Sequence, residues 1–130
     1  MIKALEHLAI AATDPAALAQ WYCATLGFAM LVASPESQTY FVGLTGGGII
    51  EILPVVGAAT SQPATVGLHH LALAVDAFDA AYAQLLAQGV RFTGPAYRSP
   101  DGSTQFDFFT DPEGNRLQLV CRAQPLGKAV

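Results

Sequence analysis

The sequence predicts an α+β protein in which two βαβββ modules form an open, barrel-like arrangement of strands around a cavity. An internal repeat is the first observation, because His7-Leu8-Ala9-Ile10-Ala11 returns as His70-Leu71-Ala72-Leu73-Ala74. Each copy leads through an aspartate into an alanine-rich stretch that ends at a glycine, which is typical of a helix. Three β-prone runs then follow in each half. The order strand, helix and three strands therefore occurs twice.

The length of 130 residues suits one domain with a real hydrophobic core. We expect that domain to span residues 1–130. The first module covers residues 4–54 and the second covers residues 68–122. Residues 55–67 are rich in proline and small side chains, so we interpret them as a connector between the modules.

The first module begins with an alternating pattern from Leu5 to Ala11, which predicts a strand with one helix-packed face. Thr13 or Asp14 can cap the following helix, whose first turn accepts Pro15 because that turn leaves the amide hydrogen unused. Gly27 supplies the turn that ends the helix. The three expected strands are residues 28–33, 39–44 and 48–53.

The second module repeats this plan, with Asp76 as the expected helix cap and Gly89 as the expected end. One face of this helix should carry the apolar residues Phe78, Tyr82, Leu85 and Leu86. The expected strands are residues 90–93, 105–110 and 115–121, and residues 97–103 are expected to be a polar loop. Asp111-Pro112-Glu113-Gly114-Asn115 has the composition of a hairpin turn.

Composition excludes several classes of function. Hydrophobic residues make up 52% and charged residues 12%, which excludes disorder and indicates that a second subunit covers apolar surface, so we expect a homodimer. A net charge of −4 with six Lys+Arg provides no basic stripe for nucleic acid. No run reaches the roughly 18 apolar residues of a membrane span, and the first residues lack a signal-peptide pattern, so we expect a cytoplasmic protein.

Cys23 and Cys121 are expected to be buried free thiols.

Two histidines stand at matching positions of the repeat. His7 and His70 each share a strand face only with alanines, and small residues there leave space for a cavity beside each imidazole. Glu51 interrupts an otherwise aliphatic run, where a metal ion would compensate the cost of burying a carboxylate. Gln118 occupies the corresponding place in the second module. If the modules pair about a pseudo-twofold axis, these four side chains converge and can hold a divalent ion with open positions for water or substrate.

The chain resembles the vicinal-oxygen-chelate superfamily, which includes glyoxalases, bleomycin-resistance proteins and extradiol dioxygenases, over about residues 4–122. The pieces that carry the resemblance are His7-Leu8-Ala9-Ile10, Trp21-Tyr22, Leu26-Gly27-Phe28, Ile50-Glu51-Ile52, His70-Leu71-Ala72-Leu73 and residues 111–115. The resemblance implies metal ligands at His7, Glu51, His70 and Gln118. It also implies one divalent ion (Zn, Ni, Co, Mn or Fe), a small-molecule substrate, and a dimer as the commoner state.

Gln118 departs from the family pattern, because lactoylglutathione-lyase-like members carry a glutamate there as ligand and base. An amide can coordinate through its oxygen but accepts no proton at useful pH. By the pseudo-twofold logic Glu51 then becomes the catalytic base. We therefore expect a metal-dependent lyase or isomerase that acts on a small oxygen-rich substrate through a metal-stabilised enolate. The alternatives are a metal-free binding protein of the bleomycin-resistance kind, an extradiol-type dioxygenase, and a paralogue that has lost its chemistry.

Other residues receive secondary roles. Arg98 and Arg122 are the candidates for holding an anionic substrate. His69 should point to the face opposite His70 and be a structural or surface residue. Phe106, Phe108 and Phe109 are interpreted mainly as core, with one of the first two as a possible pocket wall.

Overall fold

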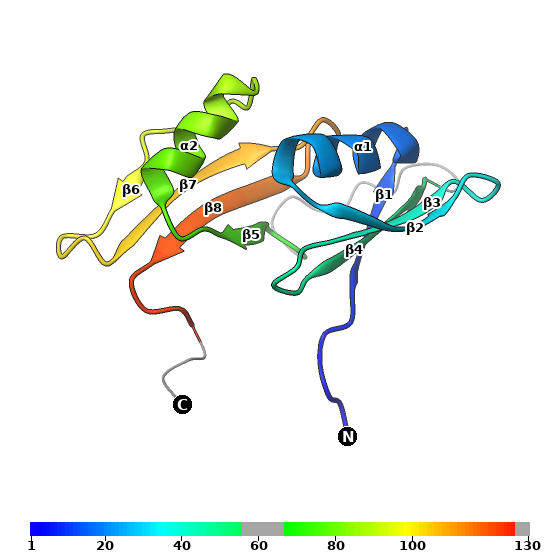
Figure 1. Cartoon of the computed structure of the whole chain (residues 1–130), viewed down its shortest axis with the longest axis horizontal. Coiled ribbons are helices and arrows are strands. Elements are labelled where there is room, and N and C mark those ends of the chain that lie inside the picture. Colours follow the sequence, from blue (N-terminus) through cyan, green and yellow to red (C-terminus); the bar gives the residue numbers. More distant parts are fainter. Residues whose placement is uncertain (56–66, 127–130) are drawn as a thin grey trace. The chain divides into compact units, whose positions relative to one another are not determined.

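Each half of the chain folds into a four-stranded mixed sheet with one helix (Figure 1). The computed structural model describes residues 1–55 and 67–126, and the chain divides into two units, Met1–Ser61 and Gln62–Val130. The predicted α+β class and the twofold βαβββ order are confirmed. Most of the predicted connector, residues 56–66, lies outside the described residues, so its character stays a prediction.

The first unit contains the following elements in chain order: β1 (Leu8–Ala12), α1 (Pro15–Leu26), β2 (Ala29–Ser34), β3 (Thr39–Gly43) and β4 (Ile49–Pro54). Its strands lie in the order β1-β4-β3-β2. β1 runs parallel to β4, whereas β3 is antiparallel to both β4 and β2. The chain therefore crosses over through α1, and its first and last strands become neighbours.

Helix α1 begins and ends where its sequence predicts. The Asp14 side chain accepts a hydrogen bond from the amide of Ala17 at 3.1 Å, and Pro15 occupies the first turn. Gly27 ends the helix with φ +78°, a left-handed conformation that residues with a Cβ rarely adopt. The helix buries Leu18 and Tyr22, which are 1% and 0% exposed.

The core of the first unit lies between α1 and one face of its sheet. Alternate residues of the strands, Ile10, Ile50 and Ile52 among them, are buried there. Ala9 and Ala11 point the other way and are exposed. We call the side of each sheet that faces away from its helix the open face.

The second unit contains β5 (Leu71–Ala74), α2 (Phe78–Ala87), β6 (Tyr97–Arg98), β7 (Thr104–Thr110) and β8 (Arg116–Arg122). The strand order is β5-β8-β7-β6, which reproduces the order of the first sheet. Parallel pairing joins β5 to β8, and antiparallel pairing joins β8 to β7 and β7 to β6. Hydrogen bonds from the amides of Glu113 and Asn115 to the Asp111 carboxylate stabilise the predicted β7–β8 turn.

The predicted strand at residues 90–93 is wrong. Phe92 makes only a single bridge to Phe109, and the edge strand β6 lies instead at Tyr97–Arg98, inside the predicted loop. The reason is the Asp107 carboxylate, which accepts hydrogen bonds from the Gly94 amide at 3.1 Å and from the Thr93 hydroxyl at 3.4 Å. These bonds hold residues 93 and 94 against the Asp107 side chain of β7, and no continuous ladder forms there.

The start and one face of α2 also differ from expectation. Ala77, not Asp76, occupies the N-cap position, and no side chain caps the helix. Phe78 and Leu85 are buried as predicted, but Leu86 is 50% exposed. Gly89 follows the helix with φ +90°, so the predicted end is confirmed within one turn.

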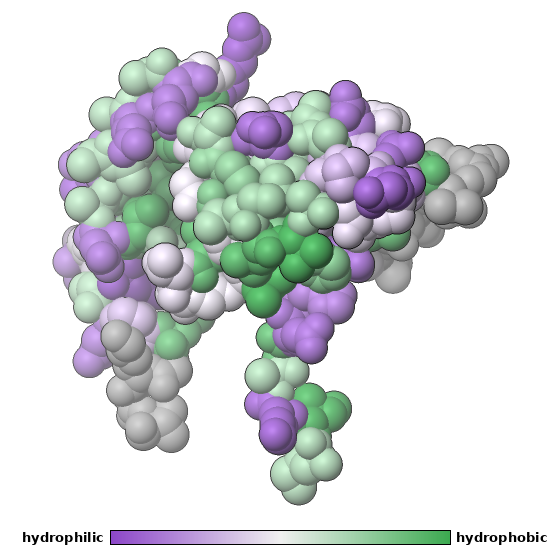
Figure 2. Space-filling view, turned by 45° about the vertical axis from the view of Figure 1, so that its right-hand side comes forward, coloured by the Kyte–Doolittle hydropathy of each residue, from purple (hydrophilic) through white to green (hydrophobic). Residues whose placement is uncertain are grey.

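Apolar side chains remain exposed at the edge of the first sheet. Met30, Leu31 and Val32 of β2 are 39%, 50% and 51% exposed, and the molecular surface shows several hydrophobic areas (Figure 2). Neither helix in the described part of the chain is long and apolar enough to cross a membrane.

The Tyr82–Asp107 hydrogen bond supports a prediction about stability. The Tyr82 hydroxyl donates to Asp107 Oδ2 at 3.0 Å, and burial, together with this bond to the carboxylate, raises the pKa of Tyr82. Tyr82→Phe should lower the free energy of unfolding at pH 7 by about 1–2 kcal/mol in urea denaturation. Because the pKa of Tyr82 is raised in the folded protein, its contribution to the unfolding free energy is complete below pH 10 and is lost as the pH rises through the folded-state pKa. The difference in unfolding free energy between the parent and Tyr82→Phe should therefore shrink above pH 10.

The matched control is Tyr97→Phe, because Tyr97 is 46% exposed and stacks on Phe106 without the Asp107 bond. Its unfolding free energy should stay within about 0.5 kcal/mol of the parent. Equal stability of Tyr82→Phe and the parent protein at pH 7 would contradict the anchoring role of the bond.

Candidate functional site

His7 and Glu51 lie together on the open face of the first sheet. His7 comes immediately before β1, and the parallel register pairs Ala9 with Glu51 on the neighbouring strand. His7 Nε2 and Glu51 Oε1 are 3.6 Å apart, with side-chain exposures of 33% and 25%. The two predicted ligands of the first module are therefore neighbours and partly accessible.

The environment of His7 orients its ring. Glu6 Oε1 lies 3.0 Å from His7 Nδ1, so the neutral ring can donate its Nδ1 hydrogen to this carboxylate. The Nε2 lone pair is then directed to the side of Glu51. A histidine that donates one ring hydrogen to a carboxylate while its other nitrogen stays free is the usual form of a metal-binding histidine. The Phe41 ring meets the imidazole edge-on at 5.7 Å.

The second unit repeats this arrangement with an amide in place of the carboxylate. His70 comes immediately before β5, and Gln118 pairs with Ala72 in the parallel register. Gln118 is 9% exposed, and Phe108 pairs with it from β7. The rings of His70 and Phe108 meet edge-on at 5.2 Å.

His69 contacts His70 directly, which the prediction of opposite faces did not anticipate. The Nδ1 atoms of the two histidines are 2.8 Å apart, and Arg116 Nη1 lies 3.0 Å from His69 Nε2. Because a guanidinium can only donate, His69 Nε2 accepts this bond, and the hydrogen of a neutral His69 ring is on Nδ1, toward His70. His69 therefore donates to His70 Nδ1, and His70 must release this bond to offer the Nδ1 lone pair to a metal.

Phe41 and Phe108 are the residues that sequence reasoning underestimated. Phe41 lies ten residues before Glu51 (51 − 41) and pairs with it on the neighbouring strand. Phe108 lies ten residues before Gln118 (118 − 108) and pairs with it in the same way. Each also contacts the candidate histidine. This equal spacing was the available signal, but it depends on first aligning Glu51 with Gln118.

The donor set of each unit suits a divalent metal but is incomplete alone. No group of three or more His, Cys, Asp or Glu side chains close enough to hold a metal occurs within residues 1–55 and 67–126. One unit offers an imidazole nitrogen and a carboxylate oxygen, and the other offers an imidazole nitrogen and an amide oxygen. Such mixed nitrogen and oxygen donors fit Zn, Co, Ni, Mn or Fe.

The two arginine candidates lie on opposite faces of the second sheet. Arg98 pairs with Gln105 on the side where α2 packs, lines a hollow of about 330 Å³, and forms an ion pair with Asp79 at 3.6 Å. Arg122 shares the open face with Gln118, because both are even-numbered residues of β8. Arg122 lines a separate cavity that also includes Ala72.

The cysteines are free thiols, as predicted, although both are half-buried rather than buried. Burial raises the pKa of the Cys23 thiol, which disfavours the reactive thiolate. The Cys121 sulfur donates to the backbone carbonyl of Asp76 at 3.5 Å. Neither residue joins the candidate ligands.

Comparison with known proteins gives a consistent result. The family model described as the Glyoxalase/Bleomycin resistance protein/Dioxygenase superfamily matches residues 4–119. The uncharacterized protein YaeR of Escherichia coli (strain K12) is 34% identical over 129 residues, covering 91% of this chain and 95% of that protein.

Two solved structures have the same fold. The glyoxalase family protein from Enterococcus faecalis is 30% identical, with a TM-score of 0.69 over 92% of this chain and 98% of that one. TnmS3, an antibiotic binding protein from Streptomyces sp. CB03234, is 24% identical, with a TM-score of 0.73 over 93% and 97% of the two chains. The second likeness concerns the fold alone.

The position of Glu51 generates a prediction about stability. A carboxylate between Ile50 and Ile52, with only 25% of its side chain exposed, should cost stability in the metal-free protein. Glu51→Leu should raise the free energy of unfolding of the metal-free chain by about 1 kcal/mol in urea denaturation. The control Glu36→Leu, at an exposed position, should change it by less than about 0.5 kcal/mol. A loss of stability in Glu51→Leu would mean that the carboxylate supports the fold.

Proposed function

The chain belongs to the Glyoxalase/Bleomycin resistance protein/Dioxygenase superfamily, and from that membership we propose that it is a divalent-metal-dependent enzyme. Its substrate is a small molecule with adjacent oxygen atoms, and its reaction is of the lyase or isomerase type. One observation carries this proposal. The first unit has His7, Glu51 and Phe41 together on an open sheet face, and the second unit carries His70, Gln118 and Phe108 at the matching positions.

The proposed ligands are His7 and Glu51 from the first module and His70 and Gln118 from the second. Two observations support them: the free Nε2 side of His7 next to Glu51, and the location of Gln118 on a strand face lined by alanines. When bound, a divalent ion supplies Lewis acidity to adjacent substrate oxygens. The neighbouring rings of Phe41 and Phe108 shield the imidazoles from bulk water on one side.

Glu51 is the proposed catalytic base. Among the four ligands it is the one carboxylate, and the amide of Gln118 cannot accept a proton at useful pH. Glu51 Oε1 takes the proton from the substrate carbon next to the carbonyl and returns it to a neighbouring carbon or to the leaving oxygen. His7 Nε2 lies 3.6 Å away, so the ring and this carboxylate can face the same ion.

A metal-free binding protein is the second candidate, and a row of aromatic rings favours it. Tyr97 stacks on Phe106 at 4.8 Å between ring centroids, and Phe106 meets Phe108 at 5.7 Å on the open face of the second sheet. Such a row can stack a planar ligand. His7, His70 and Glu51 could alternatively supply the two histidines and one carboxylate of an extradiol-type dioxygenase.

We also propose that the protein is a homodimer. β2 is an edge strand with three exposed large apolar residues, and edge strands of this kind are normally covered. A second copy of the chain would bury them.

Metal binding distinguishes the enzyme from the binding protein. The purified full chain, dialysed against Zn²⁺ or Co²⁺, should retain one ion per chain by elemental analysis. His7→Ala and His70→Ala should each weaken binding at least tenfold, because each removes an imidazole ligand. Glu36→Ala, at an exposed position, is the control and should keep the stoichiometry. If parent and variants all fail to retain metal, the enzyme proposal fails and the binding protein is favoured.

Glu51→Gln separates the base from the ligand. The amide oxygen can still coordinate, so the variant should keep its metal, but it cannot take a proton. The metal-loaded parent should speed deuterium incorporation from D₂O into dihydroxyacetone, a ketone with an adjacent hydroxyl, as followed by NMR. Glu51→Gln should lose at least 100-fold of this rate, whereas Glu36→Gln should lose none. Unchanged exchange in a metal-loaded Glu51→Gln protein would assign the base elsewhere.

A further inference from the structure

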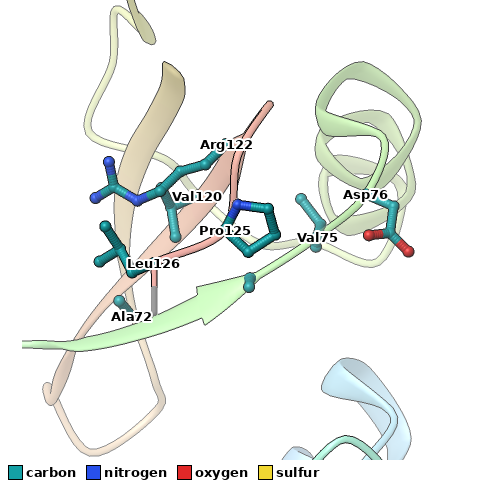
Figure 3. A pocket seen from close by; sticks show the side chains of 8 residues that line it. Ala72, Val75, Asp76, Val120, Arg122, Pro125 and Leu126 are labelled. Atoms are coloured by element: carbon teal, nitrogen blue, oxygen red, sulfur yellow. The ribbon is translucent and has the colours of Figure 1, made fainter. Parts of the chain in front are cut away.

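A cavity of about 340 Å³ lies on the open face of the second sheet (Figure 3). That volume is at the small end of the range for ligand pockets. Its apolar lining comes from Ala72, Ala74, Val120, Pro125 and Leu126. The size and lining suit a short hydrocarbon chain.

The cavity exists because two strand positions carry small side chains while the chain after β8 folds back. Ala72 and Ala74 are exposed on the open face, and Val120, 6% exposed, forms the floor beside them. The Ala123 amide donates to the Ser103 carbonyl at 2.8 Å, which holds the segment that leaves β8. Pro125 and Leu126 follow directly and supply the remaining apolar wall.

Arg122 provides the positive charge of this cavity. Elsewhere in the second unit, Arg98 is paired with Asp79 and Arg116 is bonded to His69. Among the described residues no ion pair or hydrogen bond involves the Arg122 guanidinium. Its fork of donors is therefore available to bind a carboxylate or phosphate in bidentate geometry.

Asp76 is the other charged residue of the lining. Figure 3 shows its carboxylate and the Arg122 guanidinium on opposite sides of the apolar residues. An anion is therefore favoured at the Arg122 end and disfavoured at the Asp76 end. The charges give a bound molecule one preferred direction.

The Ala72 end of the cavity lies beside the strand position of Gln118, one of the second pair of proposed ligands. Ala72 pairs with Gln118, and Ala74 pairs with Val120, so the alanines lie between the His70–Gln118 end and the Arg122 end. Four residues separate Gln118 from Arg122, which corresponds to about 13 Å along a strand. A short chain of a few carbon atoms fits within this interval.

We propose that Arg122 and this cavity bind the anionic end of the substrate. The substrate is thus a short oxo or hydroxy acid with a second acidic group, whose apolar chain lies over Ala72 and Ala74 and whose adjacent oxygens lie at the His70–Gln118 end. This assignment of substrate class rests on the proposed function, whereas the binding of an anion at Arg122 can be tested without it.

The test uses calorimetric titration of the full chain with defined probes. In the metal-free protein the probes are hexanoate, butyl phosphate and hexanol, which separate a carboxylate, a phosphate and a neutral chain. At least one anion should bind tenfold or more tightly than hexanol, and the better anion identifies the acidic group. Arg122→Gln should abolish that preference, and Arg98→Gln, whose guanidinium is paired on the other face, should keep it.

Two further measurements complete the test. Ala74→Leu should abolish binding of all three probes without loss of the far-ultraviolet circular dichroism spectrum, because Ala74 is exposed and the larger side chain fills the cavity.

In the metal-loaded protein 2-oxoadipate should bind at least tenfold more tightly than 2-oxohexanoate, and Arg122→Gln should remove this difference. An anion preference that survives Arg122→Gln, or none in the parent, would overturn the proposal. If the protein binds no metal but still prefers an anion over hexanol through Arg122, only the proposed function is overturned.

Discussion

The parallel pairing of the first and last strands of each module is the constraint on which the candidate site depends. It brings His7 within 3.6 Å of Glu51, and it pairs Gln118 with Ala72, two residues after His70, although 44 and 48 positions separate the members of these pairs (51 − 7 and 118 − 70). The helix between the strands buries one face of the sheet and leaves the other open. A histidine, an oxygen donor and a phenylalanine thus meet on a surface that the core does not need.

Local sequence patterns determined much of the fold. Alternation marked β1 and an aliphatic run marked β4. Asp14, Pro15 and Gly27 marked the ends of α1, because caps and left-handed turns depend on residues near in sequence. The repeat then identified both histidines and aligned Glu51 with Gln118. These predictions needed no knowledge of long-range contacts.

Three features that sequence reasoning missed depend on such contacts. The Asp107 side chain of β7 binds residues 93 and 94, and the edge strand forms only at β6. Arg116 binds His69 from a strand 47 residues away, which changes the environment of His70. Strand register places Arg98 and Arg122 on opposite faces of the second sheet. The sequence pattern could not predict this, because Arg98 was expected in a loop.

The central claim is that the two duplicated pairs bind one divalent ion. X-ray absorption spectroscopy of the full chain loaded with one equivalent of Co²⁺ tests it most directly, because imidazole rings give multiple-scattering features that water and carboxylate do not. We expect two imidazoles and otherwise oxygen ligands in the parent protein, and a single imidazole in His7→Ala or His70→Ala. A coordination shell of oxygen alone in the parent would contradict it.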